Sequence, residues 1–112
     1  MRQLSEHTVA FAYVEFHDGS GGKKRPVIII SLDGEKVTFY RITSQYFNKS
    51  EYIRSKYYQI RDWGEAGLTK PSWVDTITPL TVSQDSCYFK ILGHFTKRDI
   101  IGLERFINSL GE

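Results

Sequence analysis

Residues 27–30, Val-Ile-Ile-Ile, form a short run that is apolar on both faces of an extended chain. Such a run is typical of a central strand that is covered on both sides. Pro26 is expected to open this strand, at a position where a missing N–H is tolerated. Asp33-Gly34 then gives a hairpin turn signal, and residues 37–42 return with roughly alternating polarity. The chain is therefore expected to hold an antiparallel pair at the centre of a sheet.

Further strands are expected at 9–16, 57–60, 73–77 and 88–94, which are rich in β-branched and aromatic residues and bounded by turn residues. Residues 17–22 and 45–50 read as loops, and residues 50–56 as a short helix. Residues 62–67 are expected to form one helical turn, which Asp62 can cap and Gly67 can end.

The clearest helix signal lies near the C-terminal end of the sequence. Thr96 can cap this helix, Asp99 falls in its first turn, and Gly111 suits its end. Short strands at hairpin spacing with a terminal helix predict a mainly β protein, a small and strongly bent antiparallel sheet or barrel with helices packed on it. The apolar face of the expected helix consists of Ile100, Leu103, Phe106, Ile107 and Leu110.

Length and cysteine usage bound the class of protein. The 112 residues, 40% of them hydrophobic, suit a single domain spanning 1–112 with a core of its own. Cys87 is the single cysteine, so an intrachain disulfide or a multi-cysteine zinc site cannot form, and the residue reads as a buried small hydrophobe. A reducing, cytoplasmic setting fits this usage. The first residues are too polar for a signal peptide, and the longest aliphatic run is too short to span a membrane.

Basic residues gather in two places, although the net charge is only +2. One group is Lys-Lys-Arg at 23–25, and the other lies between 49 and 61. The second group belongs to the segment 46–63, in which cations alternate with aromatic residues. Unpaired RNA bases stack on aromatic rings while cations meet phosphates. The alternative is that Tyr58 and Ile60 pack inward and the charges form a solvated face. The candidate RNA contacts are Lys23, Lys24, Lys49, Arg54 and Lys56.

Arg25 and the pair Thr43-Ser44 are each expected at a strand end. A guanidinium stays protonated and offers several donors in fork geometry, and hydroxyls can hydrogen-bond a phosphate. The pattern therefore suits the handling of phosphate. The alternatives are a solvated loop arginine and ordinary turn chemistry after a strand.

Four segments, in order, resemble MazF/PemK-type toxins. Residues 22–31 resemble the glycine-basic-Arg-Pro-apolar signature of that family, and residues 42–44 fall where it carries Thr-Ser after the next strand. Residues 63–72, WGEAGLTKPS, resemble its tryptophan, Ala-Gly-Leu and Lys-Pro-Ser segment. Residues 91–96 resemble its isoleucine-x-glycine before the C-terminal helix. The resemblance runs from about 9 to 107, nearly the whole chain.

The resemblance implies an SH3-like antiparallel barrel of the MazF/PemK/CcdB-like plasmid maintenance toxin type. It also implies the toxin of a type II toxin–antitoxin system: a homodimer that cuts single-stranded mRNA at specific sequences without a metal ion or cofactor, and a cognate antitoxin that blocks the RNA groove. In such a reaction the neighbouring 2′-OH attacks the phosphate. Arg25 would stabilise the extra-negative phosphorane more than the ground state, and Thr43 would hold the phosphate with Ser44 in support.

The residue that moves the proton stays open. Many family members carry an arginine and an aspartate on the strand after Lys-Pro-Ser, and here that strand has Asp75 without the arginine. Asp75 is a candidate partner or an ordinary exposed carboxylate. His17 ends the first strand, and a histidine ordinarily titrates near neutrality. Some relatives carry a glutamate where this chain has Ser-Gly-Gly-Lys at 20–23. The alternative is therefore a non-catalytic RNA-binding or gyrase-poison-like protein on the same fold.

Overall fold

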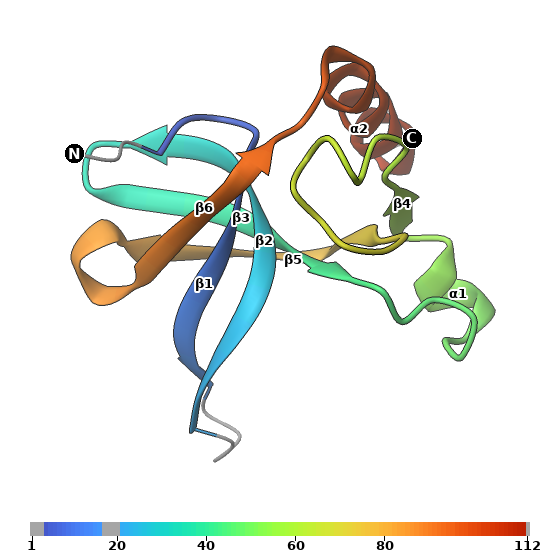
Figure 1. Ribbon diagram of the computed structural model, residues 1–112. Helices are drawn as coiled ribbons and strands as arrows, with labels where there is room; N and C mark the ends of the chain where they lie inside the picture. Colours follow the sequence, from blue (N-terminus) through green and yellow to red (C-terminus); the bar gives the residue numbers. More distant parts are fainter. Residues whose placement is uncertain (1–3, 17–20, 112) are drawn as a thin grey trace.

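The computed structural model describes residues 4–16 and 21–111, and these form one antiparallel sheet with two helices beside it (Figure 1). Across the sheet the strand order is β4-β5-β3-β2-β1-β6. The helices are α1 (Glu51–Arg54) and α2 (Lys97–Leu110), with a short 3-10 helix at Gln84–Ser86. No helix in the described residues is long and apolar enough to cross a membrane. The strands are β1 (Thr8–Phe16), β2 (Gly21–Asp33), β3 (Lys36–Thr43), β4 (Tyr57–Gln59), β5 (Trp73–Ser83) and β6 (Tyr88–His94).

β2 is the central strand that the sequence predicts. It pairs with β1 on one side and β3 on the other, and Val27, Ile28 and Ile29 are buried. Successive side chains point to opposite faces, so Ile28 joins one core cluster while Val27 and Ile29 join the other. The predicted hairpin turn is also confirmed, because β3 follows β2 after a turn in which Gly34 has a φ of 61°.

The basic segment that ends at Arg25 lies inside β2 and not in a loop, because β2 begins at Gly21 rather than at Pro26. Lys24 and Arg25 are both paired with β1. Pairing of β2 with β3 begins only at Val27, so β2 has a partner on one side at Pro26, where a missing N–H is tolerated. The loop expectation was wrong here because pairing with a distant strand outweighs the local turn signal of the glycines.

The sheet is strongly bent and open. Register shifts interrupt the ladders between β1 and β6, between β2 and β3, and between β3 and β5, and such bulges bend strands. The β1–β2 hairpin consequently crosses β3 and β5 steeply (Figure 1). The mainly β class with short helices and a C-terminal helix is confirmed. Within the described residues no ladder joins the outer strands β4 and β6, so the expected SH3-like barrel is an open one.

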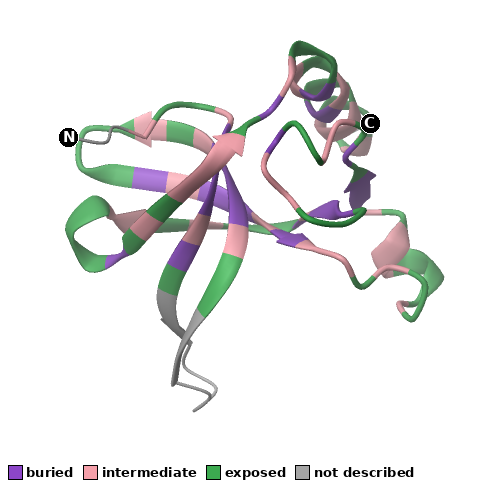
Figure 2. Cartoon of the chain, in the orientation of Figure 1, coloured by how far each residue is buried: buried purple, intermediate pink, exposed green. Residues whose placement is uncertain are grey.

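α2 covers one face of the sheet, as its apolar pattern predicts. Thr96 caps the helix, its hydroxyl accepting from the Asp99 N–H at 3.5 Å, and Gly111 ends it. Leu103 is buried in the core cluster on this side, and Ile100, Phe106 and Ile107 pack against that cluster. Cys87 is buried in the opposite cluster, as predicted. Figure 2 shows buried residues concentrated where the strands cross and at β4 beside α2.

Candidate functional site

A cavity of about 480 Å³ lies where β2, the end of β3, the loop 60–72 and β6 meet. β2 contributes Lys24 and Arg25, and the loop contributes Lys70. Thr43 ends β3, and Ser44 follows it directly. The fold thus brings three cations and two hydroxyls together from distant parts of the sequence.

One wall of the cavity exists because two backbones touch. Gly67, with a φ of 89°, lies against β6 so closely that an added Cβ would come 2.4 Å from the Leu92 carbonyl oxygen. A Cβ added at Gly93 would likewise come 2.4 Å from the Ala66 carbonyl oxygen. These two glycines fall in the third and fourth family-like segments, and they are what allows the loop 60–72 to pack on β6.

The loop 60–72 contains one hydrogen-bonded turn where the sequence predicts a helical turn at 62–67, and a backbone hydrogen bond joins the two ends of the loop. The Ala66 N–H donates to the Asp62 carbonyl at 3.1 Å, and the Ile60 N–H donates to the Ser72 carbonyl at 3.1 Å. The Asp62 side chain was expected to cap this turn. Its carboxylate accepts from the Thr96 hydroxyl at 2.6 Å and from Arg98, both outside the turn. These hydrogen bonds, that to Arg98 first, lower the pKa of the Asp62 carboxyl below its ordinary value.

Four of the described residues that line the cavity carry a hydroxyl, and Thr43 and Ser44 are the pair that the sequence predicts. The Thr43 oxygen accepts from the Gln45 N–H at 3.0 Å, which is the turn chemistry expected after a strand. Since that contact uses a lone pair, the Thr43 O–H is left as a donor toward the cavity that Thr43 lines. Ser44 lines the cavity beside it. Structural and functional interpretations of Thr43 are therefore compatible.

The cavity is electropositive with an apolar floor. Lys24 and Arg25 are exposed, and the described lining residues include no carboxylate. The Lys24 ammonium lies 4.4 Å from the centroid of the Phe11 ring. Pro26 and Ile42 add apolar surface. Such a site suits a phosphate attached to an organic group, because the cations attract the phosphate while the apolar floor accommodates the organic group.

Most of the other predicted site residues lie elsewhere. Asp75 is outside the cavity-lining set, in β5 between β3 and β4, and its carboxylate accepts from the Ile77 N–H at 3.0 Å. His17 and the Lys23 side chain fall outside the described residues. The remaining candidate RNA contacts, Lys49, Arg54 and Lys56, lie in or beside α1 and do not line the cavity.

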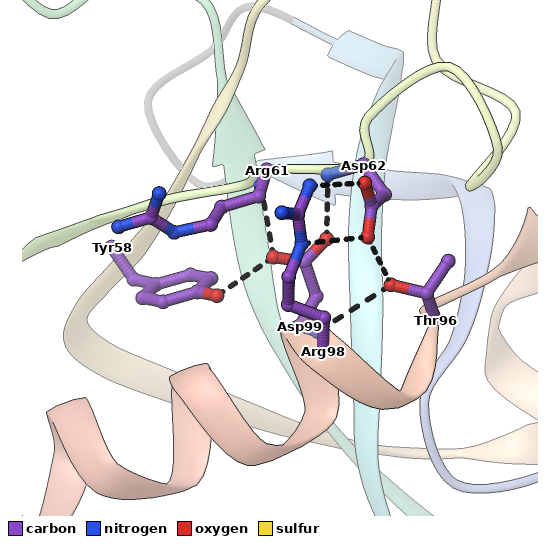
Figure 3. A network of polar contacts seen from close by, with 6 residues as sticks. All are labelled: Tyr58, Arg61, Asp62, Thr96, Arg98 and Asp99. Carbon is purple, nitrogen blue, oxygen red and sulfur yellow. Dashed lines mark hydrogen bonds and ion pairs between the residues drawn. The ribbon is translucent and has the colours of Figure 1, made fainter.

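Nothing in the sequence marks the buried carboxylate that holds the loop 60–72 in place (Figure 3). Asp99 on α2 is fully buried and accepts from the Tyr58 hydroxyl at 2.7 Å. It also accepts from the N–H groups of Arg61 and Asp62 at 2.9 and 2.8 Å. Burial, followed by the hydrogen bond to Asp99, raises the pKa of Tyr58, so the phenol stays a donor. Local helix rules placed Asp99 in the first turn but could not show these partners.

Comparison with known proteins identifies the fold. No family model and no curated protein sequence matches the chain. The structure is similar to that of the Mycobacterium tuberculosis toxin MazF-mt6, with a TM-score of 0.65 and 18% sequence identity over 91% of this chain and 93% of that chain. The chain has a MazF toxin fold. The resemblance seen in the sequence is thus confirmed at the level of the fold.

All four family-like segments contribute to the same cavity. Lys24 and Arg25 come from the first segment, Thr43 from the second, Lys70 from the third and Leu92 from the fourth. The sequence offered no reason, other than the resemblance, for these segments to meet. Lys70 was quoted there as part of Lys-Pro-Ser, and the structure places it with the other cations of the cavity.

Proposed function

We propose that this chain is an endoribonuclease toxin of a type II toxin–antitoxin system, and that the cavity binds the scissile phosphate of single-stranded mRNA. The observation that carries the proposal is the convergence of four MazF/PemK-like segments on one electropositive cavity, in a chain with a MazF toxin fold. Either alone would be weaker, since a shared fold can host unrelated functions.

The proposed reaction is attack by the 2′-OH on the adjacent phosphate, which leaves a cyclic phosphate and a 5′-OH. Arg25 stabilises the phosphorane, where negative charge increases, and so lowers the barrier more than it strengthens substrate binding. The Thr43 hydroxyl donates to a phosphate oxygen and holds it near Arg25, with Ser44 in support. Lys24 and Lys70 add attraction for the RNA backbone.

For the proton transfer, His17 and Asp75 are both kept as candidates. Asp75 is already held by the backbone of Ile77 and is not among the residues that line the cavity. The case for His17 rests on its side-chain chemistry, since the residue lies outside the described part of the chain. A histidine in this role would act first as base and then as acid.

The test is cleavage of a long single-stranded RNA in EDTA. Wild type is expected to cut it, and Arg25→Ala should lose at least about 100-fold in rate, the usual effect of removing one donor to a developing oxyanion. Arg25→Lys should also lose most activity because the fork geometry is gone. Lys97→Ala, which removes an exposed cation from α2, is the control and should cleave like wild type. Cleavage that needs a divalent metal, or full activity in Arg25→Ala, would disprove the mechanism.

A second candidate function is a non-catalytic binding protein, either for RNA or for a protein such as gyrase. It is favoured by the lining of the cavity, where the described residues include no histidine, aspartate or glutamate. This candidate predicts that wild type binds single-stranded RNA in an Arg25-dependent way, or inhibits gyrase, without cutting RNA.

The proposed function implies binding partners and a cellular location. We expect a homodimer, a cognate antitoxin that blocks the RNA site, and a cytoplasmic location where mRNA is found. Induced expression should arrest growth, and Arg25→Ala should relieve the arrest. A small acidic reading frame directly upstream would add support, whereas harmless expression of an active nuclease would count against the toxin role.

A further inference from the structure

Beside the phosphate cavity lies a second concave surface, which we call the aromatic groove. It has a volume of about 460 Å³, and the residues that define it are Tyr46, Phe47, Tyr57, Trp73 and Arg61. The Tyr46 and Trp73 rings are stacked with centroids 4.6 Å apart and planes 10° apart. Phe47 meets Trp73 edge-on at 6.0 Å and Tyr46 edge-on at 5.1 Å.

Phe47 is the feature that core packing does not explain. Phe47 is 81% exposed, which is the highest value among the exposed large hydrophobic residues in the described part of the chain. Two neighbouring rings nevertheless contact it, so its ring has a supported side and an open side. A supported aromatic ring with an open face is what stacks on a flat, unpaired base.

Charge distinguishes a nucleic-acid site from an apolar protein contact. Arg61 lines the aromatic groove and also a neighbouring cavity of about 650 Å³ on α2, where Arg98 and Arg105 join it. The described residues that line these two cavities include no carboxylate. Arg98 is paired with Asp62, while Arg61 and Arg105 are exposed. Arginines that line a surface together with aromatic rings supply the two kinds of contact that a single-stranded nucleic acid uses, cations for phosphates and rings for bases.

The aromatic groove is continuous with the phosphate cavity along the chain. Thr43, Ser44 and Gln45 line the cavity, and the next two residues, Tyr46 and Phe47, line the groove. The step from Thr43 to Tyr46 spans at most about 11 Å of extended chain. A single-stranded RNA that is held at the cavity would therefore reach the groove within a few nucleotides.

We propose that the aromatic groove is a binding site for unpaired bases of the RNA that flank the scissile phosphate, with Phe47 as the stacking platform and Arg61 as a phosphate contact. This inference rests on the proposed function, since it places the same RNA on both surfaces. It also assigns a role to the aromatic part of the segment that begins at Tyr46.

The experiment uses a fluorescein-labelled 2′-O-methyl RNA, single-stranded and long enough to span both sites, which lacks the attacking hydroxyl and cannot be cut. Its dissociation constant is measured by anisotropy at fixed salt. Phe47→Ala should weaken binding about 5- to 150-fold, which corresponds to the loss of about 1–3 kcal/mol for one stacked base. Phe47→Trp keeps a ring that can stack on a base, so its dissociation constant should be close to that of wild type. Arg61→Ala should weaken binding and reduce the salt dependence.

Two controls separate a local effect from a general one. Tyr88→Ala removes another exposed aromatic residue, which lines neither the groove nor the phosphate cavity, and it should bind like wild type. A dinucleotide that fills only the phosphate cavity should bind Phe47→Ala and wild type equally. Because Phe47 is so exposed, the variant is expected to fold, and its urea midpoint checks this.

The outcomes distinguish this inference from the proposed function. RNA binding that depends on Phe47 without any cleavage would support the aromatic groove and refute the nuclease. Arg25-dependent cleavage with unchanged RNA binding by Phe47→Ala would refute the groove alone. Loss of an acidic protein partner in Phe47→Ala, with RNA binding unchanged, would make the surface a protein contact and would also overturn the inference.

Discussion

One wall of the cavity that Arg25 and Thr43 line depends on the contact between Gly67 and Leu92. Replacing Gly67 by alanine adds a Cβ that lies 2.4 Å from the Leu92 carbonyl oxygen and 2.7 Å from its carbonyl carbon. Both atoms belong to the backbone of β6, so no flexible side chain can give way. The loop must move off β6, or β6 must bend.

Two costs add at this position. An L-residue at a φ of 89° is strained by about 1–2 kcal/mol relative to glycine. Overpacking of a close contact adds about 1–3 kcal/mol. Gly67→Ala is therefore expected to lower the free energy of unfolding by about 2–5 kcal/mol, a large share of the stability of a small domain.

Two matched variants separate the costs. Gly34 has a φ of 61° with nothing within 4 Å of an added Cβ, so Gly34→Ala measures the backbone term alone. Gly93→Ala measures the overlap alone, against Ala66 from the opposite side. Urea denaturation at constant m-value gives the three differences. If Gly67→Ala costs no more than Gly34→Ala, the close packing of the loop on β6 is refuted, and with it the wall of the cavity.

Two further predictions concern the network in Figure 3. Asp99→Ala leaves three donors without their acceptor, and since each unsatisfied buried donor costs about 1–3 kcal/mol, the free energy of unfolding should fall by at least about 3 kcal/mol. Tyr58→Phe removes one hydrogen bond and should cost about 1 kcal/mol. Equal effects of the two variants in urea denaturation would argue against a shared network. The folded state lowers the pKa of Asp62, so its contribution is present above the ordinary carboxyl pKa and is lost as pH falls through the lower folded value; the stability advantage of wild type over Asp62→Asn should therefore vanish in acid, and an advantage independent of pH would contradict the assignment.

The hydrophobic pattern of the sequence predicted the strands and helices whose buried faces are marked by a regular spacing of apolar residues. The run 27–30 indicated a strand buried on both faces, and the spacing from Ile100 to Leu110 indicated the covering face of α2, because burial imposes those patterns directly. The segment 21–25 was misread because its glycines favour a loop locally, while its pairing with β1 is decided by a strand elsewhere. Register and bend likewise depend on bulges that leave no local signature.

The candidate site divides in the same way. Arg25 and the Thr43-Ser44 pair were chosen because their side chains suit phosphate, and the structure brings them into one cavity. Asp75 was proposed from its place in the chain, and the structure instead gives its carboxylate a backbone partner two residues away. Asp99 was missed because its phenol partner, Tyr58, is 41 residues distant and nothing near either residue marks the contact.

The network around Asp99 also changes what the C-terminal helix does. Sequence alone made α2 a cover for the core, and its apolar face does pack there. Yet Asp99 binds the backbone at the start of the loop 60–72, and Thr96 binds the Asp62 side chain in that loop. The same loop carries Lys70 and Gly67 to the cavity. Since a displaced helix would release this wall, a substitution on α2 that weakens these bonds should weaken the RNA binding that we propose for the cavity, although the substituted residue does not line the cavity.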